Sequence, residues 1–193
     1  MQLWVGLGNP GAQYALHRHN VGFMAADIIS EVHGFSPWSK KFRSLVAEGR
    51  IGSDRVLLLK PQTFMNDSGD AVQQALRFYK LDIDALTVFH DELDLAPFKV
   101  KVKQGGGTAG HNGLRSIDAS LGPDFRRVRI GIGHPGPGRK DLVTPHVLGN
   151  YAKSEMEPLS DLLGAIASEA EWLANEDAVR FMSEVAVRLH QPE

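Results

Sequence analysis

The feature that most constrains this fold is the alternation of short apolar runs with segments of helical spacing. Residues 3–7 form an apolar run typical of a buried strand, and apolar residues then recur at helical spacing from Val21 to Val32. Further strand patterns follow at residues 45–51, 55–61, 85–90, 98–103 and 126–133, and a second helical pattern at residues 72–79. Strands that alternate with helices predict an α/β fold, a β-sheet flanked by α-helices.

The strand patterns also predict the kind of sheet. Only three residues, 52–54, separate residues 45–51 from 55–61, which suggests a hairpin, and residues 98–103 alternate strictly between apolar and polar. We therefore expect a twisted mixed sheet. No boundary or repeat interrupts the 193 residues, so we expect a single domain over residues 1–193, with helices from about residue 154 that flank the sheet or cover a cleft. Residues 134–146 are expected to form a loop.

Composition narrows the function classes. The chain has no cysteine, which excludes disulfides, thiolate metal sites and a cysteine nucleophile. Its N-terminus lacks a basic segment followed by a long apolar run, so we expect a soluble, cytoplasmic protein. Because the net charge is −2, a nucleic-acid site would have to be a local basic patch.

The first glycines resemble a cofactor motif. Gly6, Gly8 and Gly11 spell G-x-G-x-x-G, the fingerprint of a dinucleotide-binding turn. That turn needs a helix that begins within the motif and directs backbone N–H groups at a pyrophosphate. Here Pro10 removes one N–H donor, and helical spacing begins only at Val21. The dinucleotide interpretation is therefore disfavoured, and we expect no cofactor.

Polar side chains gather in the segments that follow the apolar strand patterns. Asn9, Asn66 and Asp91 each come just after such a run. Taken singly, each is explained as a turn former or a cap, and Asn20 is expected to cap the helix that starts at Val21. Ligands in open α/β sheets bind beyond the carboxyl ends of the strands, so together the polar loops predict a binding site there.

These residue types allow a limited chemistry. The chain has no G-x-S-x-G nucleophile elbow and no HExxH or similar spacing for a catalytic metal. A histidine paired with a carboxylate and surrounded by amides suits general-base activation of water. His19 precedes a helix N-terminus, where the helix dipole is expected to oppose protonation of the ring, and Asp91 could orient that ring.

Basic residues on two strand patterns could contact a polyanionic substrate: Lys99, Lys101, Lys103, Arg126, Arg127 and Arg129. The three lysines share one face of an alternating strand. A solvated strand face explains them about equally well. The glycine-rich loop over residues 105–113 favours the phosphate interpretation, because glycines let a ligand approach the backbone closely.

Several blocks of sequence resemble the signature blocks of bacterial peptidyl-tRNA hydrolases. They are VGLGNPG, RHNVG, KPQTFMNDSG, HDELDL, GGGTAGHNGLRSI and RVRIGIGHPG, in the family's order from residue 3 to about residue 150. The resemblance implies a monomeric α/β hydrolase that cleaves the ester between a peptide and the terminal ribose of tRNA, without metal or cofactor. The sequence departs from the family's pattern at Phe98 and Ala109, where glycine is common.

The resemblance also implies residue roles. His19 is expected as the general base and Asp91 as its partner, and Asn9 and Asn66 are expected to line the catalytic centre. The expected substrate- or tRNA-binding residues are Tyr14, Phe64, Met65, Asn66, Lys103, His111, Asn112 and Arg129. A non-catalytic RNA-binding relative is the alternative, and the retained histidine, aspartate and asparagines argue against it.

Overall fold

The centre of the molecule is a seven-stranded sheet with the strand order β2-β3-β4-β1-β5-β7-β6. The structure, a computed structural model, describes residues 1–190, so the last three residues of the predicted domain lie outside the described residues. The strands are β1 (Gln2–Gly6), β2 (Ser39–Lys41), β3 (Ser44–Ile51), β4 (Asp54–Pro61), β5 (Leu86–Glu92), β6 (Val100–Gln104) and β7 (Arg126–Gly131). β4, β1, β5 and β7 run parallel, whereas β2, β3 and β6 pair antiparallel, which confirms the mixed sheet and the β3–β4 hairpin.

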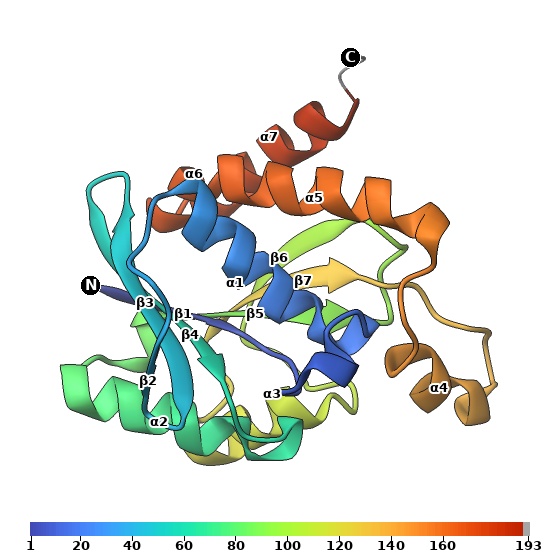
Figure 1. The fold of residues 1–193 in the computed structure, drawn as a ribbon, viewed down its shortest axis with the longest axis horizontal. Helices are drawn as coiled ribbons and strands as arrows, with labels where there is room; N and C mark the ends of the chain where they lie inside the picture. Colours follow the sequence, from blue (N-terminus) through green and yellow to red (C-terminus); the bar gives the residue numbers. More distant parts are fainter. Residues whose placement is uncertain (191–193) are drawn as a thin grey trace.

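Helices cover both faces of the sheet (Figure 1). The helices are α1 (Val21–Val32), α2 (Ser68–Tyr79), α3 (Asn112–Leu121), α4 (Val143–Val147), α5 (Met156–Ser168), α6 (Ala170–Ala174) and α7 (Ala178–His190). One hydrophobic cluster joins the sheet to α1, α5, α6 and α7, and a second joins it to α2 and α3. The α/β fold class is confirmed, and the predicted C-terminal helices flank the sheet. No helix within residues 1–190 has the length and apolar character that a membrane span requires.

Helix α1 packs unusually close to the strands below it because two glycines lie at the contact. A Cβ on Gly6 would lie 2.2 Å from the carbonyl oxygen of Gly22, and a Cβ on Gly22 would lie 2.3 Å from that of Phe89. The backbone N–H of Phe23 donates to the carbonyl of Leu7 at 3.2 Å. This contact fixes the first turn of α1, and the residues just before it, directly over the carboxyl ends of β1 and β5.

The expectation of a loop over residues 134–146 is partly wrong. This stretch contains the 3₁₀ turn η5 (Lys140–Leu142) and the start of α4. Pro145 lies in the first turn of α4, where a backbone N–H has no partner within the helix, so proline is tolerated there.

Two residues that replace a common glycine adopt the backbone conformation that glycine favours. Phe98 has φ of 63° and Ala109 has φ of 47°. A side chain in this left-handed region costs on the order of 1–2 kcal/mol. The half-buried Phe98 ring packs against the core, a contact that a glycine would lose.

We predict that Gly22→Ala strongly destabilises the protein. Its Cβ would also lie 2.5 Å from the backbone nitrogen of Leu7, so α1 must shift, and overpacking of this kind costs about 1–3 kcal/mol. Urea denaturation measures the free energy of unfolding. Gly164→Ala in α5 is the matched control, because nothing lies within 4 Å of its Cβ, and it should be neutral or gain about 0.5–1 kcal/mol. Equal stability of the two variants would contradict the close packing.

Candidate active site

The carboxyl ends of the parallel strands bring the predicted polar residues together. Asn9 follows β1, and Met65 begins the 3₁₀ turn η3 (Met65–Asp67) after β4. The backbone N–H of Met65 donates to Oδ1 of Asn9 at 2.9 Å. Asp91 lies near the end of β5. β1 lies between β4 and β5 in the sheet and pairs with both. The structure therefore places Asn9, Asp91 and the turn that contains Asn66 at the same edge of the sheet.

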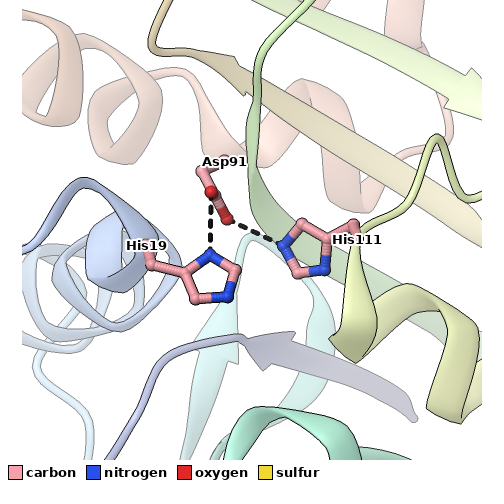
Figure 2. Close-up of side chains that lie close together, drawn as sticks. All are labelled: His19, Asp91 and His111. Atoms are coloured by element: carbon pink, nitrogen blue, oxygen red, sulfur yellow. Dashed lines mark hydrogen bonds and ion pairs between the residues drawn. The ribbon is translucent and has the colours of Figure 1, made fainter. Parts of the chain in front are cut away.

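A buried carboxylate lies between two imidazoles at this edge (Figure 2). Oδ2 of Asp91 lies 2.9 Å from Nδ1 of His19, and Oδ1 lies 2.7 Å from Nε2 of His111. His19 comes from the 3₁₀ turn η2 (Arg18–Asn20), and His111 precedes α3. The side chain of Asp91 is only 3% exposed, so each of its oxygens depends on one imidazole for its hydrogen bond.

The protonation states follow from Asp91. Burial would raise the pKa of this carboxyl, but the neighbouring His111 and His19 outweigh it and hold the pKa well below its usual range. An ionised carboxylate only accepts hydrogen bonds, so both histidines direct an N–H at it. His19 donates through Nδ1, which leaves the Nε2 lone pair of the neutral ring available as a base.

Helix α3 fixes His111 in the opposite tautomer from His19. Its Nδ1 accepts the backbone N–H groups of Gly113 at 3.1 Å and Leu114 at 3.3 Å, so the ring serves as the N-cap of α3. A nitrogen that accepts from two backbone donors carries no proton, and the proton of the neutral ring must therefore sit on Nε2, facing Asp91.

The net shift of the His19 pKa is opposite to the one expected from the helix dipole alone. Burial lowers the pKa of His19, but the charge of Asp91 and the hydrogen bond to it raise the pKa, and the net result is a pKa above its usual value. A carboxylate at 2.9 Å outweighs the partial charge of a helix end. Asp91 therefore makes His19 a stronger base than an isolated histidine.

A cavity of about 260 Å³ opens beside His19, Asp91 and His111, which we call the triad. Its lining includes the three triad residues, the loop over residues 108–112, and one side of α4. His90 also lines it; its Nδ1 donates to the main-chain oxygen of Asp91 at 2.8 Å. Burial, together with the nearby His111, lowers the pKa of His90 to about 4, so His90 stays neutral near pH 7.

Asn20 has a role other than the predicted one. It stands at the N-cap position of α1, but its side chain makes no capping bond within the described chain. Its Oδ1 instead accepts the backbone N–H of Asn9 at 2.9 Å, and its Nδ2 donates to the Asn9 carbonyl at 2.9 Å. Asn9 is thus held at its backbone by Asn20 and at Oδ1 by Met65, and its Nδ2 has no partner among residues 1–190.

The remaining predicted contact residues surround this centre. Asn112 is exposed at the start of α3 and lines the cavity. Phe64, 60% exposed, and Asn66 lie on either side of the buried Met65. Tyr14 is half-buried in the 3₁₀ turn η1 (Ala12–Tyr14), with its ring edge-on to His17.

The basic residues of β6 and β7 differ in exposure. Lys101 pairs with Arg129 and Lys103 with Arg127 across the two strands, so all four side chains lie on one sheet face. The lysines are exposed, and Lys103 lies against Gly106, where the absence of a Cβ makes room for its Nζ. Arg129 is half-buried and donates to Glu92 at 2.8 Å.

Two of the six predicted basic residues have structural partners instead of open surface. Arg127 is only 2% exposed and donates to the main-chain oxygens of Gly106 and Pro123. Arg126 donates to the carbonyl of Leu173. The basic surface of this edge therefore consists of Lys99, Lys101 and Lys103, with Arg129 beside them.

The triad could also be considered as a metal site. Within residues 1–190, one ligand atom from each of His19, Asp91 and His111 lies within 4.8 Å of the others. Both imidazoles, however, direct N–H groups at the carboxylate, and the other nitrogen of His111 is taken up by α3. This bonding supports proton transfer more than metal coordination.

Sequence reasoning missed three features of the site. The helical form of the cavity wall on α4 is not predicted, because proline and glycine interrupt its pattern, although Val143, Val147 and Leu148 have helical spacing. His90 was read only as part of a strand, and its adjacency to Asp91 in sequence was the available signal. Arg18 begins the signature block RHNVG, but the sequence does not show its contacts, since both its side-chain partners lie more than 100 residues away.

Comparisons with known proteins give one consistent result. The sequence model of the family described as peptidyl-tRNA hydrolase matches residues 3–192. The chain is 73% identical over 188 residues to the peptidyl-tRNA hydrolase of Novosphingobium aromaticivorans, which covers 97% of both chains. It is 69% identical over 189 residues to that of Rhizorhabdus wittichii, which covers 98% of this chain and 99% of the relative.

A solved structure agrees with the sequence comparisons. The crystal structure of peptidyl-tRNA hydrolase from Acinetobacter baumannii superposes with a TM-score of 0.88 at 38% identity, over 96% of this chain and 94% of that one. Fold, sequence and the order of the signature blocks all agree, and the chain therefore belongs to the peptidyl-tRNA hydrolase family, whose members are hydrolases that act on ester bonds.

Proposed function

We propose that His19 is the general base with which this enzyme hydrolyses the ester between the peptide and the tRNA of peptidyl-tRNA. The observation that carries the proposal is the Asp91 carboxylate at 2.9 Å from Nδ1 of His19, which leaves the Nε2 lone pair available. A water molecule gives its proton to Nε2 as its oxygen attacks the ester carbonyl. Asp91 stabilises the imidazolium that forms.

The second half of the reaction returns the proton. The tetrahedral intermediate collapses, the bond between the carbonyl carbon and the ribose oxygen breaks, and this oxygen takes the proton from Nε2 of His19. The products are a tRNA with its terminal hydroxyl restored and a peptide carboxylic acid, which releases its remaining proton to solvent and becomes the carboxylate. His19 is again neutral and ready for the next turnover.

Amide groups at the same edge would stabilise the intermediate. Oδ1 of Asn9 is occupied by Met65, so its Nδ2 is the group available to donate to a developing oxyanion. Asn66 and Asn112, exposed on neighbouring turns, supply further amides that could bind the substrate or position the water. His111 holds the other oxygen of Asp91 and so keeps the carboxylate turned toward His19.

Groups around the centre fit the two halves of the substrate. Lys103 and Arg129 suit a tRNA phosphate, and Lys103 lies beside a glycine-rich loop that a phosphate could approach. Tyr14 and the exposed Phe64 offer rings for the RNA end, and Met65 offers an apolar contact for the peptide.

We also infer a monomeric, cytoplasmic enzyme from the family resemblance. Sedimentation would test the oligomeric state, and cell fractionation would test the location.

We expect His19→Ala to lower kcat by about 10²- to 10⁴-fold, the usual contribution of a positioned general base. Hydrolysis of purified peptidyl-tRNA is the assay. His190→Ala, at the exposed end of α7, is the control and should retain wild-type turnover. Near wild-type turnover of folded His19→Ala would remove the assignment, and RNA binding without ester cleavage by the wild type would favour a non-catalytic relative.

Hydrolysis of peptidyl-tRNA should persist in EDTA. A loss of activity in EDTA that zinc restores would support a metal site.

The acid limb of the pH profile should report His19. Because its pKa is raised and only the neutral ring acts as a base, kcat/KM should fall as the pH drops through a value above about 6.5. Asp91→Asn removes the charge that raises this pKa, so burial then dominates and the limb should move to lower pH while the plateau rate falls. A limb that stays in place in Asp91→Asn would show that another group titrates.

The phosphate contact predicts a salt effect. Lys103→Ala should weaken tRNA binding and reduce the slope of log K against log salt concentration by about 1, since one phosphate contact is lost. Lys40→Ala on β2, at the opposite edge of the sheet, is the matched control. If both variants show the wild-type slope, Lys103 makes no phosphate contact.

A further inference from the structure

Helix α4, which covers the cavity and which we call the cover helix, is held only partly by burial, through the half-buried Val147 that packs against the core. None of its residues is fully buried, yet Val143 and Val147 form part of the cavity wall that includes His19 and Asp91. α4 also contacts η2, the turn that carries His19. A helix of five residues is marginal by itself, so its position depends on specific bonds to its surroundings.

Arg18, the residue before His19, supplies such bonds. Its Nη1 donates to the main-chain oxygen of His146 in α4 at 3.2 Å, and its Nη2 donates to Oε1 of Glu155 at 3.0 Å. The guanidinium carbon lies 5.6 Å from the ring centre of Tyr151. Because this side chain is only 15% exposed, solvent competes weakly with its contacts.

Backbone hydrogen bonds join the same segments. The N–H of Arg18 donates to the carbonyl of Gly149 at 3.0 Å, and the N–H of Tyr151 donates to the carbonyl of Leu16 at 3.0 Å. An isolated antiparallel bridge lies between these two bonds. A Cβ on Gly149 would lie 3.0 Å from Nη1 of Arg18, so the glycine permits the close approach. The chain entering His19 and the chain leaving α4 thus run side by side.

We propose that Arg18 is a positioning residue that couples the cover helix α4 to the general base His19. The inference rests on the proposed role of His19. The last turn of α4 is bonded to the end of the sheet through Nε2 of His146 and the carbonyl of Ile132 at 3.0 Å, and to the Arg18 guanidinium through the carbonyl of His146. Because Arg18 is the residue before His19, its bond sets the position of the cavity wall relative to the base. Loss of this bond lets α4 move away from the cavity and lets η2 shift, although the His19–Asp91 pair itself remains.

Kinetics of two variants test this coupling. Arg18→Gln should lower kcat and raise KM for peptidyl-tRNA, with a combined loss of about 10- to 100-fold in kcat/KM, the scale of a misplaced catalytic group. Arg18→Lys should lose less, because an ammonium keeps the charge near Glu155 but cannot present the planar fork that serves two acceptors. The acid limb of the pH profile should stay in place in both variants, since Asp91 still sets the pKa of His19.

A second measurement is independent of turnover. Amide hydrogen exchange should accelerate in Arg18→Gln both at residues 143–149 and at residues 18–20, because the hydrogen bond from the Arg18 side chain to His146 joins these two segments. Arg180→Gln, which breaks the exposed ion pair with Glu184 on α7, is the matched control and should change neither exchange nor kinetics. The double variant Glu155→Gln, Arg18→Gln should lose no more kcat/KM than Arg18→Gln alone, because the bond between these two side chains is already absent.

Clear results would overturn the proposal. Wild-type kcat and KM in folded Arg18→Gln, even with a lower stability, would show that Arg18 is only structural. Faster exchange confined to one of the two segments would show that they are not coupled. Failure of the proposed function is distinguishable, because it would appear as undiminished turnover in His19→Ala, whatever Arg18 does.

Discussion

The site depends on one buried carboxylate that accepts a hydrogen bond from each of two imidazoles. A charge in this position would be costly without partners, and within residues 1–190 the carboxylate oxygens of Asp91 accept hydrogen bonds only from His19 and His111. The arrangement determines both protonation states, since a carboxylate that only accepts forces each ring to donate. It also joins three separate segments, because His19 comes from the turn before α1, Asp91 from β5, and His111 from the start of α3.

The fold makes this arrangement possible by bringing strand ends and helix starts to one edge. β1, β4 and β5 run parallel, so the segments that follow them emerge at the same side. The glycine contact between Gly6 and Gly22 lets α1 begin almost on the strands, and the turn carrying His19 is thereby placed within reach of β5. His111 performs two tasks with its two nitrogens, one for α3 and one for Asp91.

Features that depend on local pattern could be predicted from the sequence. Six of the seven strands, the principal helices and the position of Asn9 and Asp91 at strand ends follow from periodicity and from the topology rule for open sheets. The short exposed strand β2 has no apolar pattern and is not predicted. The pairing of His19 with Asp91 came from the family resemblance, because spacing alone does not show which loops meet.

Features that depend on tertiary contacts could not be predicted. Asn20 fitted the rule for a helix cap. Its side chain instead forms two hydrogen bonds with the backbone N–H and carbonyl of Asn9, and these bonds replace the cap. The sign of the His19 pKa shift required the distance to Asp91, which no sequence pattern contains. Arg127 was indistinguishable from a surface residue in the sequence, yet its partners are the carbonyls of a loop twenty residues earlier.

The hydrogen-bonding groups of the cavity describe the kind of small molecule that would block it. Nε2 of His19 has no partner within residues 1–190 and requires a donor, whereas both carboxylate oxygens of Asp91 are already taken. An inhibitor should therefore carry an uncharged N–H, as an amide does. Cationic groups aimed at the aspartate would gain little, because they would have to displace an imidazole. Neutral hydrogen-bond donors therefore suit this cavity better than basic amines.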